Sequence, residues 1–209
     1  MSNVINMGKG LNHMVDLSLI RPESVVIDGG AAKGDFIEAY RKLDNESKIF
    51  AFEPNRTNLV YIKNNIDLHD VVLIDKALVG NDHHGKVMFS EFVGVNGRYY
   101  QWGNIYGTHA KKKRKELKEV IEYEVDTITL LDIVEKYDIK DIGFMKLDVE
   151  GAEKEIIETL SADILKIIRQ ISLEYHSAEA SDFIRKFLEQ EYEVNEDLIH
   201  GEIYAKRKQ

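Results

Sequence analysis

Short apolar runs alternate with amphipathic stretches along most of this chain, and this alternation constrains the fold more than any other feature. Apolar runs that predict strands occupy residues 25–27, 49–52, 71–74, 142–147 and 171–174. The stretches between and after them predict helices at 35–43, 55–67 and 178–190, and one or two helices at 151–168. Short strands separated by helices are typical of a parallel sheet with helices on both faces. We therefore expect the α/β class, with a doubly wound and mostly parallel sheet.

The two ends of the chain and one internal segment depart from this rhythm. Residues 192–194 and 203–205 flank His200-Gly201 and predict a closing antiparallel hairpin. Residues 1–22 are expected to form a helical or irregular lead-in. Residues 80–125 form a long insertion rich in glycine and aromatic residues, of which 86–91 and 120–125 are expected to form strands or a hairpin. A chain of 209 residues suits one domain over 1–209.

The charge and the residue composition limit the classes of partner. The formal net charge of -9 disfavours binding to nucleic acid and to anionic membranes, so neither is an expected partner. The absence of cysteine excludes disulfides, thiolate zinc sites and cysteine nucleophiles. No secretory signal and no apolar run of about 18 residues is visible, which favours a cytoplasmic location. The basic run 111–115 is interpreted as a solvated helix face rather than as a site for an acidic acceptor.

Two strand ends carry a candidate cofactor site. The segment DGGAAKG at 28–34 follows the first strand, where glycines let the backbone approach a ligand and the next helix favours a carboxylate. Asp28 is placed to hold the ammonium group of a ligand such as S-adenosylmethionine, directly or through water. Glu53 ends the second strand, where an acidic residue can accept both ribose hydroxyls. The cofactor candidates are Asp28, Gly29, Gly30, Ala31, Gly34, Glu53, Pro54, Asn55 and, near the adenine edge, Ala77.

The same glycine segment also permits a different cofactor. Residues 29–34 read G-x-A-x-x-G, which is close to a nicotinamide-binding fingerprint. Glu53 follows Gly34 at a distance compatible with that fingerprint. A nicotinamide-dependent oxidoreductase therefore stays open from this segment alone.

Two later strand ends carry a second cluster of charged residues. The segment FMKLDVEGAE at 144–153 brings Lys146 and Asp148 to the sheet edge, and ISLEYH at 171–176 brings Glu174 and His176 to the neighbouring strand end. Crowded ionisable groups favour acid–base or metal chemistry. These four residues are the catalytic candidates. Glu153 is interpreted as a solvated carboxylate at a helix N-terminus, where a negative charge is favourable.

At this point the sequence resembles the FkbM family of methyltransferases. The resemblance runs from Val25 to Glu174 and rests on DGGAAKG, AFEPN, DKALVG, VDTITLLDI, KLDVEGAE and ISLEYH in this order. It implies a Rossmann-like class I methyltransferase fold and an S-adenosylmethionine-dependent O-methyltransferase that acts on hydroxyls of sugars or secondary metabolites. Two positions depart from the family, since Ala32 stands where asparagine is common and Lys33 where an apolar residue is common.

The sequence constrains two things less: the molecule that accepts the methyl group, and the group that takes up its hydroxyl proton. The substrate candidates are Tyr99, Tyr100, Trp102, Tyr106 and His109 of the insertion, which could form an acceptor lid or simply bury their own aromatic rings, together with Glu150. Either Asp148 or His176 accepts the hydroxyl proton, or a divalent metal held by Asp148, Glu174 or His176 replaces this base. The sequence does not choose between them.

Two further alternatives concern the whole chain. A non-catalytic binding module with this fold, as a partner of a glycosyltransferase, is disfavoured by the acidic residues retained at both sites. The chain is also compatible with one domain of a larger glycan-modifying enzyme.

Overall fold

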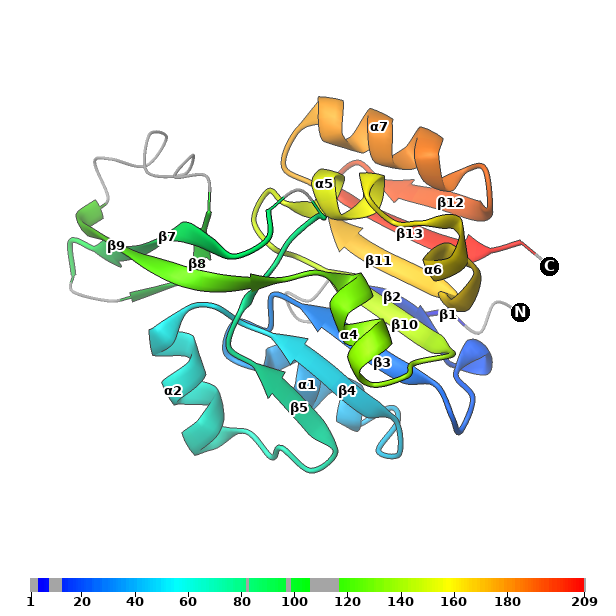
Figure 1. Cartoon of the computed structure of the whole chain (residues 1–209), viewed down its shortest axis with the longest axis horizontal. Coiled ribbons are helices and arrows are strands. Elements are labelled where there is room, and N and C mark those ends of the chain that lie inside the picture. Colours follow the sequence, from blue (N-terminus) through cyan, green and yellow to red (C-terminus); the bar gives the residue numbers. More distant parts are fainter. Residues whose placement is uncertain (1–3, 8–12, 82, 97–98, 106–116, 209) are drawn as a thin grey trace.

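The computed structural model describes residues 4–7, 13–81, 83–96, 99–105 and 117–208 (Figure 1). Its main element is a seven-stranded sheet in the order β12-β13-β11-β10-β3-β4-β5. The strands are β3 (Val25–Gly29), β4 (Lys48–Phe52), β5 (Val71–Ile74), β10 (Ile142–Leu147), β11 (Gln170–Glu174), β12 (Tyr192–Asp197) and β13 (Glu202–Arg207). Strands β5, β4, β3, β10 and β11 are mutually parallel, and β13 and β12 pair antiparallel. The predicted doubly wound sheet with a closing hairpin is confirmed.

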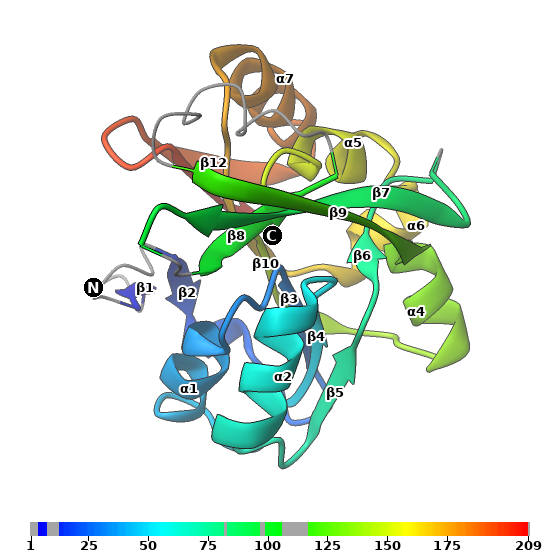
Figure 2. The ribbon, with the colours of Figure 1, turned by 90° about the vertical axis from the view of Figure 1, so that its left-hand side faces the viewer.

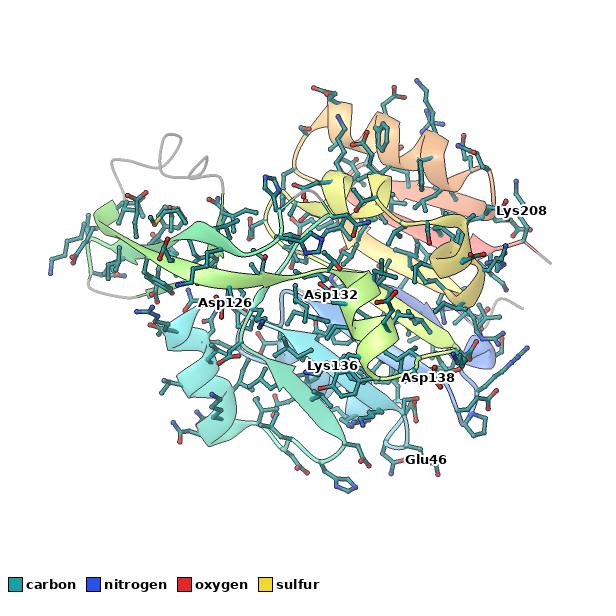
Figure 3. All side chains as sticks on the ribbon, in the orientation of Figure 1. Glu46, Asp126, Asp132, Lys136, Asp138 and Lys208 are labelled. Carbon is teal, nitrogen blue, oxygen red and sulfur yellow. The ribbon has the colours of Figure 1, made fainter. Side chains whose placement is uncertain are left out.

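Helices cover both faces of this sheet because successive strand residues point to opposite faces. On one face, α1 (Asp35–Arg41) and α2 (Arg56–Asn65) pack on Val26 and Ile49. On the other face, one apolar cluster joins Ile27 and Phe50 to the helices α4 (Leu130–Lys136), α5 (Glu153–Glu158), α6 (Ala162–Ile167) and α7 (Ala178–Leu188). Charged side chains such as Glu46, Asp138 and Lys208 lie at the periphery (Figure 3). The two apolar layers therefore hold the sheet between the helices and fix where its strands end.

Side-chain caps begin several of these helices. Asn55 Oδ1 accepts a hydrogen bond from Asn58 N at the start of α2. Thr129 and Asp132 form a reciprocal capping box at the start of α4, a helix that the sequence analysis did not predict. The predicted segment 151–168 divides into α5 and α6, and Ser161 caps the second of them. Polar residues with short side chains therefore set where these helices begin.

The N-terminal segment differs from the expected helical or irregular lead-in. Strands β1 (Val4–Asn6) and β2 (Met14–Asp16) form an antiparallel pair, followed by a 3-10 helix at Leu17–Leu19. Asp16 N donates to Gln170 Oε1 at 2.8 Å, and Gln170 Nε2 returns a hydrogen bond to the Asp16 carbonyl at 3.0 Å. The expectation was wrong because these short strands are stabilised by contacts with β11, which local periodicity does not reveal.

The insertion forms a second sheet in the order β6-β9-β7-β8. Its strands are β6 (Ala77–Leu78), β7 (Lys86–Gly94), β8 (Tyr99–Asn104) and β9 (Leu117–Ile128). The strands expected at 86–91 and 120–125 are confirmed as parts of β7 and β9, which pair antiparallel although β8 lies between them in the sequence. This sheet lies across the edge of the main sheet at which the parallel strands end (Figure 2). Among the described residues, no helix is long and apolar enough to cross a membrane.

Candidate functional site

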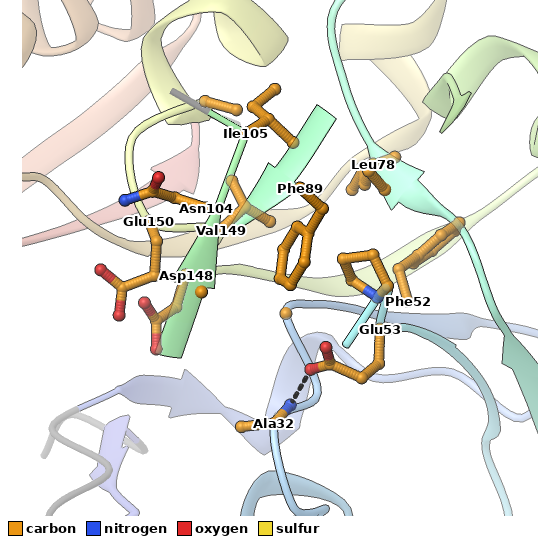
Figure 4. A pocket seen from close by; sticks show the side chains of 15 residues that line it. Ala32, Phe52, Glu53, Leu78, Phe89, Asn104, Ile105, Asp148, Val149 and Glu150 are labelled. Carbon is orange, nitrogen blue, oxygen red and sulfur yellow. Dashed lines mark hydrogen bonds between the residues drawn. The ribbon is translucent and has the colours of Figure 1, made fainter. Parts of the chain in front are cut away.

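A cavity of about 180 Å³ lies at this edge, between the main sheet and the inserted sheet (Figure 4). The main sheet contributes residues that follow β3, β4 and β10, and the inserted sheet contributes residues of β6, β7 and β8. The lining residues are Gly30, Ala32, Phe52, Glu53, Pro54, Ala77, Leu78, Phe89, Gly103, Asn104, Ile105, Asp148, Val149, Glu150 and Ala152. The carboxyl ends of parallel strands, where the strand order reverses, are the usual ligand site of such a sheet.

The turn after β3 is locked to both neighbouring strands. Gly30 N donates to the Phe52 carbonyl at 3.1 Å, and Asp148 N donates to the Gly29 carbonyl at 3.0 Å. Gly30 has a φ of 83°, and a Cβ at this position would lie 1.9 Å from the Asp148 carbonyl oxygen. Only glycine fits both the left-handed conformation and this close backbone approach.

Glu53 closes the cavity on the side of β4. Its carboxylate accepts hydrogen bonds from Ala32 N and Asn55 N, each at 2.7 Å. The residue is 5% exposed, and burial raises the pKa of its carboxyl to about 8 against the opposing effect of these hydrogen bonds. Because each carboxylate oxygen has two lone pairs, Glu53 can accept further hydrogen bonds from a ligand.

The predicted cofactor residues divide into two groups. Gly30, Glu53, Pro54 and Ala77 line the cavity. The other five support the turns around it: Gly34 begins α1 with a φ of 86°, Asn55 caps α2, Gly29 packs on Leu147, and Ala31 and Asp28 are buried.

Asp28 is paired with Lys146 beneath the cavity floor. Lys146 Nζ lies 3.1 Å from Asp28 Oδ1 and 3.9 Å from Asp148 Oδ2. It also donates to the carbonyls of Gly29 at 3.2 Å and Gly30 at 2.5 Å. Burial opposes the charge on Lys146, but the carboxylates of Asp28 and Asp148 outweigh it and raise the pKa of the ammonium group. Asp28 is fully buried, so its observed partner is this lysine.

The second cluster surrounds His176, which follows β11. Its Nε2 lies 3.5 Å from Glu150 Oε2 and 3.6 Å from Glu153 Oε1, and its Nδ1 lies 3.9 Å from Glu174 Oε1. Burial opposes protonation of His176, but these carboxylates prevail and raise its pKa. Burial and the charge of Asp148 raise the pKa of Glu150 to about 7, and burial also raises that of Glu174. The four predicted catalytic residues thus lie near one another, but only Asp148 lines the cavity, whereas Lys146, Glu174 and His176 do not.

Glu153 contradicts the expectation of a solvated helix N-terminus. It is 2% exposed, and its carboxylate accepts hydrogen bonds from Val149 N at 2.9 Å and from Gly151 N at 3.0 Å. The side chain turns inward because the backbone amides of the 148–151 turn need acceptors. Glu153 therefore holds the turn that carries Glu150.

A metal could bind in this cluster. Asp148, Glu150 and His176 each offer one ligand atom, and these atoms lie within 4.8 Å of one another. Carboxylate oxygens with an imidazole nitrogen suit a divalent cation such as Mn²⁺. The sequence analysis expected Glu174 among the metal ligands, whereas this group contains Glu150 in its place.

The substrate candidates of the insertion are only partly described. Tyr99, Tyr100 and Trp102 lie on β8. Tyr106, His109 and the basic run 111–115 lie outside the described residues.

Sequence reasoning missed several residues near the site, among them three of the insertion and one of the N-terminal segment. Phe89, Asn104 and Ile105 line the cavity from the insertion. His13 is 3% exposed, and its Nδ1 lies 3.2 Å from Ser172 Oγ and 3.6 Å from Glu202 Oε1. Burial, aided by Lys146, lowers the pKa of His13 to about 3. No local pattern places these residues, because each reaches the site through a tertiary contact.

The mixed seven-stranded sheet, the glycine turn and the acidic strand end together define a class I methyltransferase fold. The family model described as a methyltransferase FkbM domain matches residues 28–194, so the chain belongs to the FkbM family of methyltransferases. This assigns the glycine turn to a methyltransferase rather than to the nicotinamide-dependent oxidoreductase that residues 29–34 left open.

Two methyltransferases are similar in sequence to this chain over most of its length. Methyltransferase sdnD of Sordaria araneosa is 22% identical over 78% of this chain and 70% of its own length. Methyltransferase 1 of Beauveria bassiana (strain ARSEF 2860) is 25% identical over 76% of this chain and 67% of its own length.

Two solved structures share the fold. The crystal structure of methyltransferase FkbM from Methylobacillus flagellatus KT matches 90% of this chain with a TM-score of 0.54 and 14% identity, and this chain spans 45% of that protein. Precorrin-6y C5,15-methyltransferase from Geobacter metallireducens GS-15 matches 92% of this chain and 85% of its own, with a TM-score of 0.50 and 16% identity.

Proposed function

We propose that this protein is an S-adenosylmethionine-dependent O-methyltransferase that acts on a hydroxyl group of a sugar or a related small molecule. The observation that supports this most strongly is that one cavity has carboxylates at two ends. Glu53 lies at the β4 end, and Asp148 and Glu150 lie at the β10 end. One acidic end suits the ribose of the cofactor, and the other suits an acceptor that must lose a proton.

The lining residues fit the cofactor. Glu53 is buried but faces the cavity, which is what hydrogen bonding to ribose hydroxyls requires. Phe52, Pro54 and Ala77 provide an apolar surface for the adenine. Gly30 and Asp148 would hold the methionine end. Bound S-adenosylmethionine would supply a methyl group activated by the positive charge on sulfur.

The residues of this chain would then act on the acceptor. Asp148 or Glu150 would accept the proton of the acceptor hydroxyl, and the hydroxyl oxygen would bond to the methyl carbon as the carbon–sulfur bond breaks and S-adenosylhomocysteine leaves. His176 compensates the surrounding negative charge and orients Glu150 through the 3.5 Å ion pair. Lys146 fixes Asp148 from below. Holding the oxygen in line with the transferable methyl group supplies much of the rate.

The type of acceptor follows from the polarity of this end of the cavity. Asn104 joins Asp148 and Glu150 there, so an acceptor meets several hydrogen-bonding groups within a small space. A polyhydroxylated molecule satisfies such a wall better than an apolar alcohol does. The same Asp148, Glu150 and His176 could hold a divalent cation, which would acidify the hydroxyl as a Lewis acid.

The test is a methyl-transfer assay with a panel of sugars, nucleotide sugars and small alcohols. Formation of S-adenosylhomocysteine and the chemical shift of the new methyl group are measured with magnesium, with manganese and with EDTA. We expect an O-methyl product. Asp148→Asn should lower kcat by about 100-fold or more and change the Kd for S-adenosylmethionine by less than about threefold. Loss of activity in EDTA would assign the proton step to a metal.

Two results would refute this function. A product methylated on nitrogen or carbon would exclude O-methylation. Absence of S-adenosylmethionine binding would exclude methyl transfer from this cofactor. Equal binding by wild type and Glu53→Ala would leave the function standing but would remove Glu53 from the cofactor site.

A further inference from the structure

The inserted sheet contributes an aromatic side chain to the cavity. Phe89 of β7 is 3% exposed and lines the cavity together with Phe52 and Pro54. Figure 4 shows its ring projecting from the inserted sheet toward Glu53. A Cβ on Gly103 of the neighbouring strand β8 would lie 2.5 Å from Phe89 Cζ. Glycine at this position therefore leaves the space that the ring occupies.

A tyrosine ties this wall to the main domain. Tyr123 of β9 lies opposite Phe89, and their ring centroids are 5.7 Å apart. Its hydroxyl accepts a hydrogen bond from Arg56 N at 3.1 Å and donates one to Glu91 Oε2 at 3.2 Å. The guanidinium carbon of Arg56 lies 4.1 Å from the Tyr123 ring centroid. Tyr123 thus connects β7, β9 and the first residue of α2.

We propose that the inserted sheet forms the adenine wall of the cofactor site, with Phe89 in contact with the purine and Tyr123 as the residue that positions Phe89. The identity of the ligand rests on the proposed function. An aromatic face opposite the apolar Phe52 and Pro54 suits a flat, uncharged ring system. The insertion then serves the cofactor as well as any acceptor.

The connectivity explains why this wall and Glu53 act on one ligand. Glu53 directly follows β4, and Arg56 begins α2 three residues later. Tyr123 holds β9 at this same point, so the ribose-binding carboxylate and the aromatic wall share one anchor. A ligand that contacts both is expected to restrain the inserted sheet against the main sheet.

The contact is tested by calorimetry with S-adenosylmethionine and S-adenosylhomocysteine. Phe89→Leu keeps a large apolar side chain and removes the aromatic face, and it should weaken both ligands roughly tenfold. The control is Met88→Ala on the same strand, because Met88 is 51% exposed, and its Kd should stay within about twofold of wild type. Thermal unfolding of each variant verifies that it is folded.

The positioning role is tested by a double-mutant cycle. Tyr123→Phe keeps the ring and removes both hydrogen bonds, and it should weaken the cofactor several-fold in the wild-type background. In the Phe89→Leu background the same change should have little further effect, because Tyr123 acts through Phe89. Amide exchange in β7 and β9 of the unliganded protein should also become faster in Tyr123→Phe.

The outcomes separate this inference from the proposed function. If wild type does not bind S-adenosylmethionine, the proposed function fails and the adenine wall fails with it. If binding depends on Glu53 but Phe89→Leu binds as tightly as Met88→Ala, only the adenine wall is refuted. If Tyr123→Phe weakens binding equally in both backgrounds, Tyr123 does not act through Phe89.

Discussion

Replacing Lys146 by methionine is expected to destabilise the protein by about 3–5 kcal/mol. Methionine keeps an unbranched apolar chain of similar length but removes the ammonium group. Asp28 is fully buried and lies 3.1 Å from Lys146 Nζ, so it would become a buried charge without its cation. At this separation and an effective dielectric constant near 20, the attraction is about 5 kcal/mol, which agrees with that range. Asp148 adds less, because its side chain is 31% exposed.

The assay is urea unfolding followed by circular dichroism at pH 7. The control is Lys140→Met, because Lys140 forms an ion pair with Asp138 but its side chain is 77% exposed, and the change should stay within about 0.5 kcal/mol. Adding Asp28→Asn to Lys146→Met should recover much of the lost stability, since the uncompensated charge is then gone. A loss below about 1 kcal/mol for Lys146→Met, or no recovery in the double variant, would refute the reasoning.

Two further predictions concern the glycine turn and the buried histidine. Gly30→Ala should destabilise the protein by about 3 kcal/mol or more in urea unfolding, because the added Cβ overlaps the Asp148 carbonyl as well as straining φ. Gly85 also has a positive φ, but a Cβ added there would meet open space, so Gly85→Ala should lose less stability than Gly30→Ala. An equal loss of stability in the two variants would contradict the role of the overlap. His13 has its pKa lowered to about 3 by burial, so below pH 6.5 the unfolded state binds a proton that the folded state excludes. Wild type should therefore lose stability relative to His13→Gln as the pH falls from 6.5 toward 3, by on the order of 1.4 kcal/mol per pH unit; a difference that is constant with pH would contradict this.

The charged residues of the site form two sets with different roles. Lys146 and Asp28 hold the glycine turn and the end of β10 together from below, whereas Asp148 and Glu150 line the cavity. Glu153 holds the backbone turn that carries Glu150. The chemistry we propose therefore depends on two partly buried carboxylates supported by fully buried ones.

The order of strands and helices could be predicted from the sequence because it depends on local patterns of apolar and turn-forming residues. Apolar runs such as Ile49–Phe52 and a glycine-rich turn after Val25–Ile27 identify a parallel sheet without any knowledge of contacts. The positions of Glu53 and Asp148 at strand ends follow from the same patterns, since parallel strands end at one edge of a sheet. Helix α4 was missed although Thr129 and Asp132 form a capping box at its start, and the strands of the N-terminal segment were missed because contacts with β11 stabilise them.

Which of these residues face the cavity was decided only by the tertiary structure. Asp28 and Glu53 both follow apolar strands, yet Asp28 is closed off by Lys146 of a strand more than a hundred residues later, whereas Glu53 lines the cavity. Glu153 turns inward toward the amides of its own turn, and Phe89 reaches the cavity from β7, which pairs with β8 and β9. The sequence by itself determined the class of fold and the chemistry available at each strand end, because these depend on neighbouring residues. Exposure, ionisation and the composition of the cavity wall depend on distant segments that meet only in the folded chain.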